Sequence, residues 1–545
     1  MIAGHRLPLL AWYVVGLLLR CRCYSIGHAF FSSTTSSNSV GLGHVPHTRA
    51  RRFYCHFRQG SNVGRGRATV GACSEGVGGA AVVLSRRIEK IFLPPGRGLR
   101  IHALSDLHTD SKANLAWVQS WASWKGYEAG DLGEAHEDVL IVAGDISSSL
   151  ERSAETLECL MKRYDEVFFV VGNHEMWTSR QKSKTEEGGG GGLEVMGSVE
   201  KLVQMHSMCE SLGVRTDPVI FVVGGEGGGA SGAAAERGWQ ELAVFPLLSW
   251  YHASWDDEPD LPPELQLRRG DFLRRWRDYS YCHWPDDLCK HEASIDFVTV
   301  DRDALFLIAE FFARQNDGCI QAFQSTRTLT LTPATAAGAP PIDDGVERED
   351  ANEEEGAGGV VAESSRLMST SPRGASSSRG GGGAGGRNST TKVISFSHFV
   401  PRQELCPEKR LLWEPQLPKV IGSAPLERQI RELGSDVHIF GHTHIPIDMT
   451  SDGVRYVQWP LGNQREQLYR TTDMRQQGPL LVYSHDGHEG GLRPPVHTLW
   501  GEFYEAQPRD PHNTEIPENP YEYMKKIIAD GRRRRAKASD VLPEE

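Results

Sequence analysis

The sequence predicts an α/β fold built from parallel βαβ units, and three apolar runs are the main reason. The runs LRIHALSD (99–106), DVLIVAGD (138–145) and VFFVVGNHE (167–175) each have the character of a buried strand that ends in polar residues. Two helix-like stretches, 113–124 and 150–164, separate them. Strands that alternate with helices form a parallel sheet, and the functional residues of such sheets lie at the carboxyl ends of the strands.

The second half of the chain repeats this alternation. KVISFSHF (392–399) predicts a strand, and SAPLERQIREL (423–433) predicts a helix. SDVHIFGHTH (435–444) predicts a strand that runs directly into a histidine-rich loop. We therefore expect two more polar strand ends, although they lie far from the first three in the sequence.

Three stretches have the composition of flexible insertions within a single domain that spans residues 86–505. Glycine-rich sequence lies near 184–192 and at 224–238. The longest insertion, 329–390, joins an acidic cluster to Ser/Gly-rich sequence that cannot bury a core, so we expect it to be disordered. A solvated loop is the favoured interpretation of the acidic cluster, with a regulatory tract as the alternative. A charged tail, 506–545, follows the domain.

The N-terminus has the composition of a targeting segment. Residues 1–29 resemble a signal peptide, because an apolar run of signal-peptide length follows Arg6. Residues 30–85 begin with Ser-, Thr- and Arg-rich sequence and predict a disordered, transit-peptide-like segment. The tandem resembles the bipartite presequence of algae with complex plastids, which predicts import into a plastid. Mitochondrial, secreted and cytoplasmic destinations remain alternatives.

Composition and charge disfavour several classes of protein. The 545-residue chain has a net charge of −12, although its first 74 residues hold nine arginines and no Asp, Glu or Lys. The body is therefore strongly acidic, which disfavours nucleic acid as a partner. The ten cysteines include no CxxC pair, so there is no zinc-ribbon signal. No apolar run reaches the roughly 20 residues that span a bilayer, so we expect no integral membrane segment in the mature protein.

Side chains able to bind metal gather at the five predicted strand ends. They are Asp106, His108, Asp145, Asn173, His174, His398, His442 and His444. Carboxylate, amide and imidazole ligands without a thiolate suit Mn, Fe, Zn or a similar divalent ion. Two ions that share a carboxylate can hold a phosphoryl group during an in-line displacement. A single residue of this kind is more often an ordinary core or surface side chain. Eight of them at strand ends do not fit that interpretation.

These blocks closely resemble those of the calcineurin-like metallophosphoesterase superfamily: Asp-x-His, Gly-Asp, Gly-Asn-His-(Asp/Glu), a later His, and Gly-His-x-His, in this order. The resemblance implies a two-sheet β-sandwich flanked by helices, a four-layer αββα arrangement, with a dimetal site at the carboxyl ends of the strands. It implies that Asp106, His108 and His444 hold one ion. It implies that Asn173, His398 and His442 hold the second ion, and that Asp145 bridges the two.

The same resemblance implies the reaction. A metal-bridging hydroxide would attack a small phosphate mono- or diester in line, and His174 would protonate the leaving group. Glu175 stands where the superfamily more often has Asp, and it is expected to orient His174. Ser148 replaces the tyrosine of purple acid phosphatases. Four segments, among them PLLSWYHASWD and FGHTHIPID, resemble a group of the superfamily found in plants, algae and protists.

The substrate contacts are less strongly indicated. Arg402 and Arg465 are candidates to pair with a phosphate, although a surface charge is the simpler interpretation of each. His252 follows an apolar run and is equally consistent with a position in the cleft or in the core. The aromatic segment WRDYSYCHWPDD (276–287) is either core or a cap that stacks a ring of the substrate.

Two other function classes remain open at this point. A non-catalytic scaffold for protein binding would keep the fold but lose ligands, and no ligand is missing. A metal-dependent nuclease uses the same five blocks but needs a basic groove, which the acidic body disfavours. We therefore expect an enzyme that acts on a small phosphoester, with an undetermined oligomeric state.

Overall fold

The computed structural model describes residues 66–73, 84–123, 136–178, 196–224, 239–262, 275–285, 307–331, 391–412, 414–469, 474–486 and 490–516, with the single residues 272, 288, 526 and 529. The chain divides into a unit of Met1–Ser325 and Thr391–Glu545 and a second unit of Thr326–Thr390. Of the second unit, only the end of one helix is described. The predicted glycine-rich insertions and most of the N-terminal leader lie outside the described residues.

The smaller sheet holds the three strands predicted first. Its order is β13-β12-β3-β4-β5, and β3, β4 and β5 run parallel while β12 is antiparallel to β3. Seven of the eight residues of β4 are buried, as expected for a central strand covered on both faces. The strands are β3 (Gly98–Leu104), β4 (His136–Ala143), β5 (Glu166–Val170), β12 (Leu480–His485) and β13 (Gly490–Leu492).

The larger sheet holds the two later predicted strands, β8 and β9. Its order in the described chain is β1-β2-β6-β7-β8-β9-β11-β10, and β7, β8, β9 and β11 are parallel neighbours. The strands are β1 (Gly66–Cys73), β2 (Arg86–Phe92), β6 (Val219–Gly224), β7 (Trp239–Pro246), β8 (Lys392–Phe396), β9 (Val437–Phe440), β10 (Ile447–Ser451) and β11 (Val454–Gln458). Strand β1 lies within residues 30–85, so these eight residues differ from the prediction of a disordered leader.

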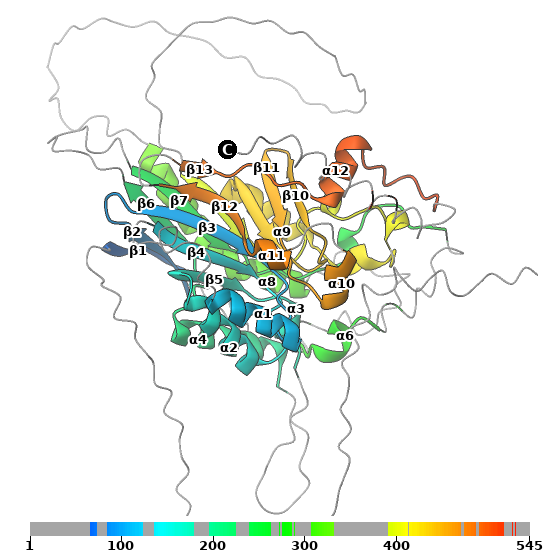
Figure 1. Ribbon diagram of the computed structural model, residues 1–545. Helices are drawn as coiled ribbons and strands as arrows, with labels where there is room; N and C mark the ends of the chain where they lie inside the picture. Colours follow the sequence, from blue (N-terminus) through cyan, green and yellow to red (C-terminus); the bar gives the residue numbers. More distant parts are fainter. Residues whose placement is uncertain are drawn as a thin grey trace, which may run out of the picture. The chain divides into compact units, whose positions relative to one another are not determined.

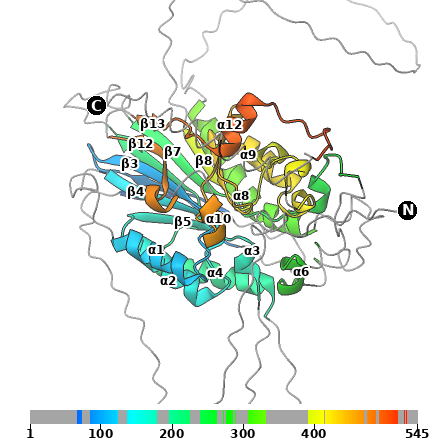
Figure 2. The same cartoon turned by 45° about the vertical axis from the view of Figure 1, so that its right-hand side comes forward.

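Helices lie on both outer sides of the two sheets (Figures 1 and 2). On the side of β3, β4 and β5 lie α1 (Lys112–Ser123), α2 (Leu150–Met161) and α4 (Ser198–Leu212). On the other side lie α8 (Leu307–Leu331) and α9 (Ala424–Leu433). The predicted αββα class is confirmed. None of the described helices combines the length and the apolar character needed to cross a bilayer.

The remaining helices are short. They are α3 (Asn173–Met176), α6 (Asp278–Tyr281), α10 (Gln464–Tyr469), α11 (Met474–Gln477), α12 (Leu499–Ala506) and the 3-10 turns η2 (Ala253–Trp255), η3 (Gln403–Leu405), η4 (Lys409–Leu411) and η5 (Leu417–Val420). Beyond α12, within the predicted tail, the Arg509 guanidinium pairs with the carboxylate of Glu258, so the first residues of that segment pack on the domain.

The hydrophobic core lies between the two sheets. Phe168 of β5 meets Phe221 of β6 and Phe396 of β8, with ring centroids 6.2 and 6.3 Å apart. At the carboxyl edge, the backbone of Ser105 exchanges hydrogen bonds of 3.1 and 2.9 Å with Trp459 and Leu461. These bonds join the end of β3 to the segment after β11. The polar strand ends of both sheets are therefore held at one edge.

Burial of His438 in β9 makes the stability of this core depend on pH. Its Nδ1 lies 2.8 Å from Ser395 Oγ and its Nε2 lies 3.0 Å from Ser397 Oγ. Burial lowers the pKa of His438 to about 3. The unfolded chain therefore binds a proton below about pH 6.5 that the folded chain does not bind. This contribution to stability is complete above pH 6.5 and is lost as the pH falls toward 3.

We expect His438→Gln to reduce the difference in unfolding free energy between pH 7 and pH 5 by roughly 2 kcal/mol, since one proton contributes about 1.4 kcal/mol per pH unit. Urea unfolding in EDTA at both pH values measures this difference. An identical pH dependence in the two proteins would show that His438 does not titrate as described.

Candidate metal centre

Five of the predicted ligands have left-handed backbone conformations. The φ angles are +53° at Asp106, +43° at His108, +56° at Asp145, +77° at His442 and +57° at His444. Among the described residues, the only other non-glycine residue with positive φ is Asp452. Each such residue costs about 1 kcal/mol or more. The packing of the fold therefore holds these side chains in positions that the local chain does not favour.

Two glycines allow the strand ends to approach one another closely. A Cβ on Gly144, which has φ of +78°, would lie 2.4 Å from His398 Nδ1. A Cβ on Gly172 would lie 2.2 Å from Asp145 Oδ1. Any side chain at either position would displace a candidate ligand. This accounts for the glycine at the start of the Gly-Asp and Gly-Asn-His blocks.

The first group of ligands comprises Asp106, His108, Asp145 and His444, whose ligand atoms lie within 4.8 Å of one another. The Nε2 atoms of His108 and His444 are 2.7 Å apart. His444 Nε2 lies 3.4 Å from Asp106 Oδ1, and His108 Nε2 lies 3.9 Å from Asp145 Oδ2. Side chains from the ends of three strands, β3, β4 and β9, therefore converge on one point.

The second group comprises Asp145, His398 and His442, and Asn173 completes it. Asn173 Oδ1 lies 3.2 Å from His398 Nε2 and 3.0 Å from His442 Nδ1. His398 Nε2 is 3.4 Å from Asp145 Oδ1, whereas the distance of 3.9 Å from His108 Nε2 is to Oδ2. The two oxygens of Asp145 therefore face different groups. The structure brings all seven predicted ligands together and places Asp145 between the two sets.

Hydrogen bonds on the far side of three imidazoles fix which nitrogen carries the proton. His398 Nδ1 lies 2.9 Å from the Ala143 carbonyl, and His442 Nε2 lies 3.0 Å from the Val420 carbonyl. His444 Nδ1 lies 2.9 Å from the Glu466 carboxylate. A carbonyl or carboxylate can only accept, so these nitrogens donate and the opposite nitrogens present lone pairs to the centre.

The electrostatics of the centre fit bound cations. Burial, followed by the charges of Glu175 and Asp106, raises the pKa of Asp145. Burial and the neighbouring imidazoles lower the pKa of His108 and His442, so these rings are neutral ligands at pH 7. Converging lone pairs and carboxylates repel one another unless a positive charge lies between them. The donor set therefore fits two divalent ions with mixed N/O ligands.

His174 lies beside the ligands but belongs to neither group. Its backbone amide donates to Asp145 Oδ1 at 3.0 Å, and its Nε2 lies 3.8 Å from Asp145 Oδ2. Its ring stacks on Trp177, with centroids 3.8 Å apart and an angle of 27° between the planes. The half-buried ring is therefore held at the edge of the centre, where it can reach a bound group without being a ligand.

Glu175 differs from the prediction that it orients His174. Its Oε2 accepts hydrogen bonds from the amides of Gly172 (2.7 Å) and Asp145 (3.0 Å), and its Oε1 accepts from those of Ile146 (2.7 Å) and Ser147 (3.1 Å). The fully buried carboxylate thus fixes the loop that presents Asp145. Successive residues on the helical turn α3 point in different directions, so Glu175 faces away from the imidazole beside it.

The three predicted substrate residues have other surroundings. Arg402 forms ion pairs with Glu404, Glu427 and Asp452, the nearest at 2.9 Å. His252 Nδ1 lies 2.7 Å from Ser254 Oγ, and burial lowers its pKa to about 4. The side chain of Arg465 is exposed on α10. Their role in binding substrate stays a prediction.

Sequence reasoning missed two residues that support the ligands. Asp278 accepts a hydrogen bond of 2.9 Å from Asn173 Nδ2, and Glu466 binds His444 as described above. Asp278 lies in the aromatic segment noted in the sequence, and Glu466 lies on α10, in RYVQWPLGNQRE, one of the segments that resemble the plant, algal and protist group. The first segment stands out by its aromatic residues and the second by that resemblance, but only the fold shows which carboxylates reach the ligands.

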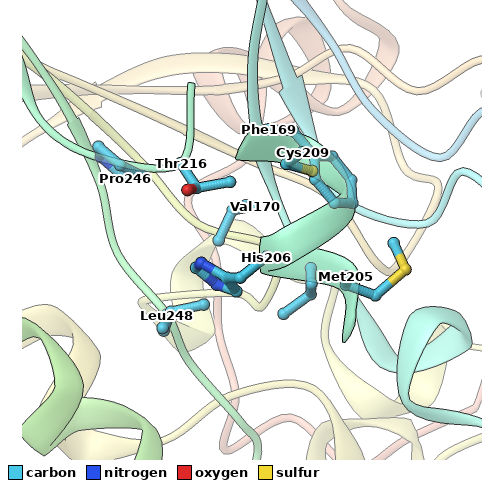
Figure 3. Close-up of a pocket in the computed structure, with 9 residues that line it drawn as sticks. Phe169, Val170, Met205, His206, Cys209, Thr216, Pro246 and Leu248 are labelled. Carbon is cyan, nitrogen blue, oxygen red and sulfur yellow. The ribbon is translucent and has the colours of Figure 1, made fainter. Parts of the chain in front are cut away.

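A separate hollow lies between α4, β5 and the segment after β7 (Figure 3). Its lining includes Val170, Met205, His206, Cys209 and Leu248, and none of the candidate ligands. It leaves no room for a water molecule. We regard it as a packing defect of the core rather than a binding site.

A family comparison covers the part of the chain that holds the first three blocks. Residues 99–285 match the model of the calcineurin-like phosphoesterase family. This segment contains the Asp-x-His, Gly-Asp and Gly-Asn-His blocks. In the structure, His398 and the Gly-His-x-His block lie at the same site. This part of the chain is therefore similar to the calcineurin-like phosphoesterases, a family of hydrolases.

The similarity to individual proteins is distant. The chain is 29% identical over 127 residues to the [acyl-carrier-protein] phosphodiesterase PptH of Mycobacterium tuberculosis, a match that covers 23% of this chain and a third (33%) of that protein. The crystal structure of phosphopantetheinyl hydrolase (PptH) from Mycobacterium tuberculosis aligns over 71% of this chain and 96% of that chain, with 16% identity and a TM-score of 0.35.

Proposed function

We propose that this protein is a metal-dependent phosphoesterase that hydrolyses a small phosphate mono- or diester. The observation that carries the proposal is the position of Asp145, whose two oxygens lie nearest to two separate groups of imidazole, carboxylate and amide side chains. A pair of bound divalent ions would supply an activated water and would neutralise charge on the phosphoryl group.

The residues of the chain have distinct tasks in this proposal. Asp106, His108 and His444 would hold one ion, Asn173, His398 and His442 the other, and Asp145 would belong to both sets. Because the pKa of His174 is lowered, mainly by burial, its imidazole is neutral at pH 7 until it meets an anionic group. A phosphate beside it would favour the protonated ring, which could then donate to the leaving alkoxide.

The charge of the chain and its similarity to a known enzyme narrow the class of phosphoester that it could cleave. The acidic body favours a small substrate over a nucleic acid, whose phosphates need a basic groove. The name of the PptH relative makes a phosphodiester as reasonable a candidate as a monoester. A phosphopantetheinyl diester therefore belongs in the substrate panel beside nucleotides and sugar phosphates.

The test is hydrolysis by the purified chain after EDTA treatment and reconstitution with Mn²⁺, Fe²⁺ or Zn²⁺. We expect turnover of p-nitrophenyl phosphate or bis-p-nitrophenyl phosphate that requires the added metal. His174→Gln should lower kcat by roughly 10²-fold or more, the usual contribution of a general acid. Exposed Glu432 on α9 provides the control Glu432→Gln.

If no metal supports hydrolysis of any mono- or diester, the result favours the alternative of a non-catalytic scaffold. Cleavage of DNA or RNA, with tight binding that weakens steeply as salt is raised, would instead favour the nuclease.

A further inference from the structure

Helix α6 places aromatic side chains directly beside the candidate metal centre. Its first residue, Asp278, is buried and accepts hydrogen bonds from Asn173 Nδ2 at 2.9 Å and Trp177 Nε1 at 2.6 Å. The other carboxylate oxygen accepts from Trp276 Nε1 at 2.9 Å. One carboxylate thus fixes α6 against both a metal ligand and the residue that stacks on His174.

A series of nearly parallel rings leads outward from the centre. His174 stacks on Trp177, and Trp177 stacks on Tyr281, with centroids 5.4 Å apart and 28° between the planes. Tyr281 ends the series and is 44% exposed. Neighbouring Tyr279 is 42% exposed and meets Tyr251 edge to face, with centroids 6.4 Å apart.

This exposure is unusual within the described part of the molecule. Only four large hydrophobic side chains there are strongly exposed: Phe92, Val203, Tyr279 and Tyr281. Two of the four lie on the single turn of α6, next to the predicted catalytic residues. Aromatic rings left in water beside a site favour a ligand that covers them, since stacking on a ring releases water from both faces.

The charge beside the rings suits a phosphorylated ligand. The guanidinium of Arg277 lies 5.9 Å from the centre of the Trp177 ring. Buried Lys201 donates to the carbonyls of Ser148 (2.7 Å) and Trp177. Two cationic side chains are therefore placed near the junction of the ring series and the metal centre, where they attract an anion.

We propose that Tyr281, supported by Trp177, forms a shelf that stacks the base of a nucleoside phosphoester while its phosphate lies at the metal centre. The shelf rests on the proposed phosphoesterase function and specifies its substrate class. Every base has a flat π-face, and stacking on an aromatic side chain contributes substantially to affinity. An aliphatic alcohol has no such face and gains less from a parallel ring.

The test compares two monoesters that differ only in the ring, adenosine 5′-monophosphate and ribose 5-phosphate, with the full chain in Mn²⁺. We expect Tyr281→Ala to lower the ratio of their kcat/KM values, AMP over ribose 5-phosphate, by roughly 5- to 100-fold through the KM for AMP. Tyr281→Phe, which keeps the ring, should retain the ratio. Phe92→Ala removes an exposed ring at the end of β2 and serves as the matched control.

An unchanged ratio in Tyr281→Ala would overturn the shelf. Equilibrium titration with the two ligands, followed by tryptophan fluorescence, separates this failure from failure of the proposed function. If nothing is hydrolysed but AMP binds more tightly than ribose 5-phosphate and Tyr281→Ala removes the difference, the shelf holds and the proposed reaction fails. Equal binding of both ligands to the unaltered protein overturns the shelf regardless of turnover.

Discussion

Replacing Asp145 with Asn is expected to lower kcat/KM by on the order of 10³-fold or more, because this carboxylate is the one side chain shared by both ligand groups. Asn offers one neutral oxygen in place of two charged ones, so at least one of the two ions loses a ligand. Stabilisation of charge by bound ions amounts to several kcal/mol, and about 1.4 kcal/mol corresponds to a tenfold change in rate. Kinetics in saturating Mn²⁺ measure the loss.

The same substitution should not destabilise the protein without metal. Asp145 is buried near Glu175 and Asp106, and its raised pKa reflects burial and this repulsion. Asn removes the charge and tolerates the left-handed backbone at this position. We expect Asp145→Asn to melt at or above the temperature of the unaltered protein in EDTA. A large drop in melting temperature would attribute the lost activity to misfolding instead.

Asp452→Asn provides the matched control for Asp145→Asn. Asp452 is the one other described Asp with a left-handed backbone that lies outside the ligand set, and its side chain is exposed. It should retain the kcat/KM and the metal dependence of the unaltered protein. Equal losses in both variants would trace the effect to the backbone at these positions rather than to the shared carboxylate.

Replacing Asp278 with Asn is expected to raise the metal concentration needed for half-maximal activity by roughly 10- to 100-fold, as is usual for residues that orient a ligand. Asp278 accepts hydrogen bonds from Asn173, Trp177 and Trp276, among others. An amide at this position would direct an N–H at one of them, and the Oδ1 of Asn173 would no longer be held toward His398 and His442. Metal titrations of activity measure the shift.

Asp138→Asn distinguishes orientation of the ligand from general stability. Asp138 is also buried and hydrogen-bonded, but it pairs with Arg100 near the start of β4, at the opposite end of the strand from Asp145. Its loss should lower the melting temperature and leave the metal dependence unchanged. If Asp278→Asn behaves in the same way, Asp278 has a structural role only.

The metal ligands could be predicted because each lies at the end of a strand, and the local sequence of each strand indicates where it ends. The apolar runs that form β3, β4, β5, β8 and β9 are local signals, and the parallel arrangement carries their ends to a common edge. The distance of 225 residues between Asn173 and His398 does not obscure this, since each block is recognised by itself. The same logic located the helices α1, α2 and α9.

Side-chain direction and long-range support could not be predicted in the same way. Arg402 follows His398 closely in sequence, but the carboxylates of Glu427 and Asp452 determine where its guanidinium lies. Asp278 reaches Asn173 across 105 residues through a contact that no periodicity marks. Strand β1 was not predicted, because the composition of residues 30–85 shows no pattern of core-forming residues. Pairing with the edge of β2 needs only backbone hydrogen bonds, which composition does not indicate.

Anomalous diffraction from crystals grown with Mn²⁺ tests most directly whether two metal ions bind on either side of Asp145. We predict two manganese peaks, one beside Asp106, His108 and His444 and the other beside Asn173, His398 and His442, with the Asp145 carboxylate between them. A single peak, or peaks away from Asp145, would contradict the account.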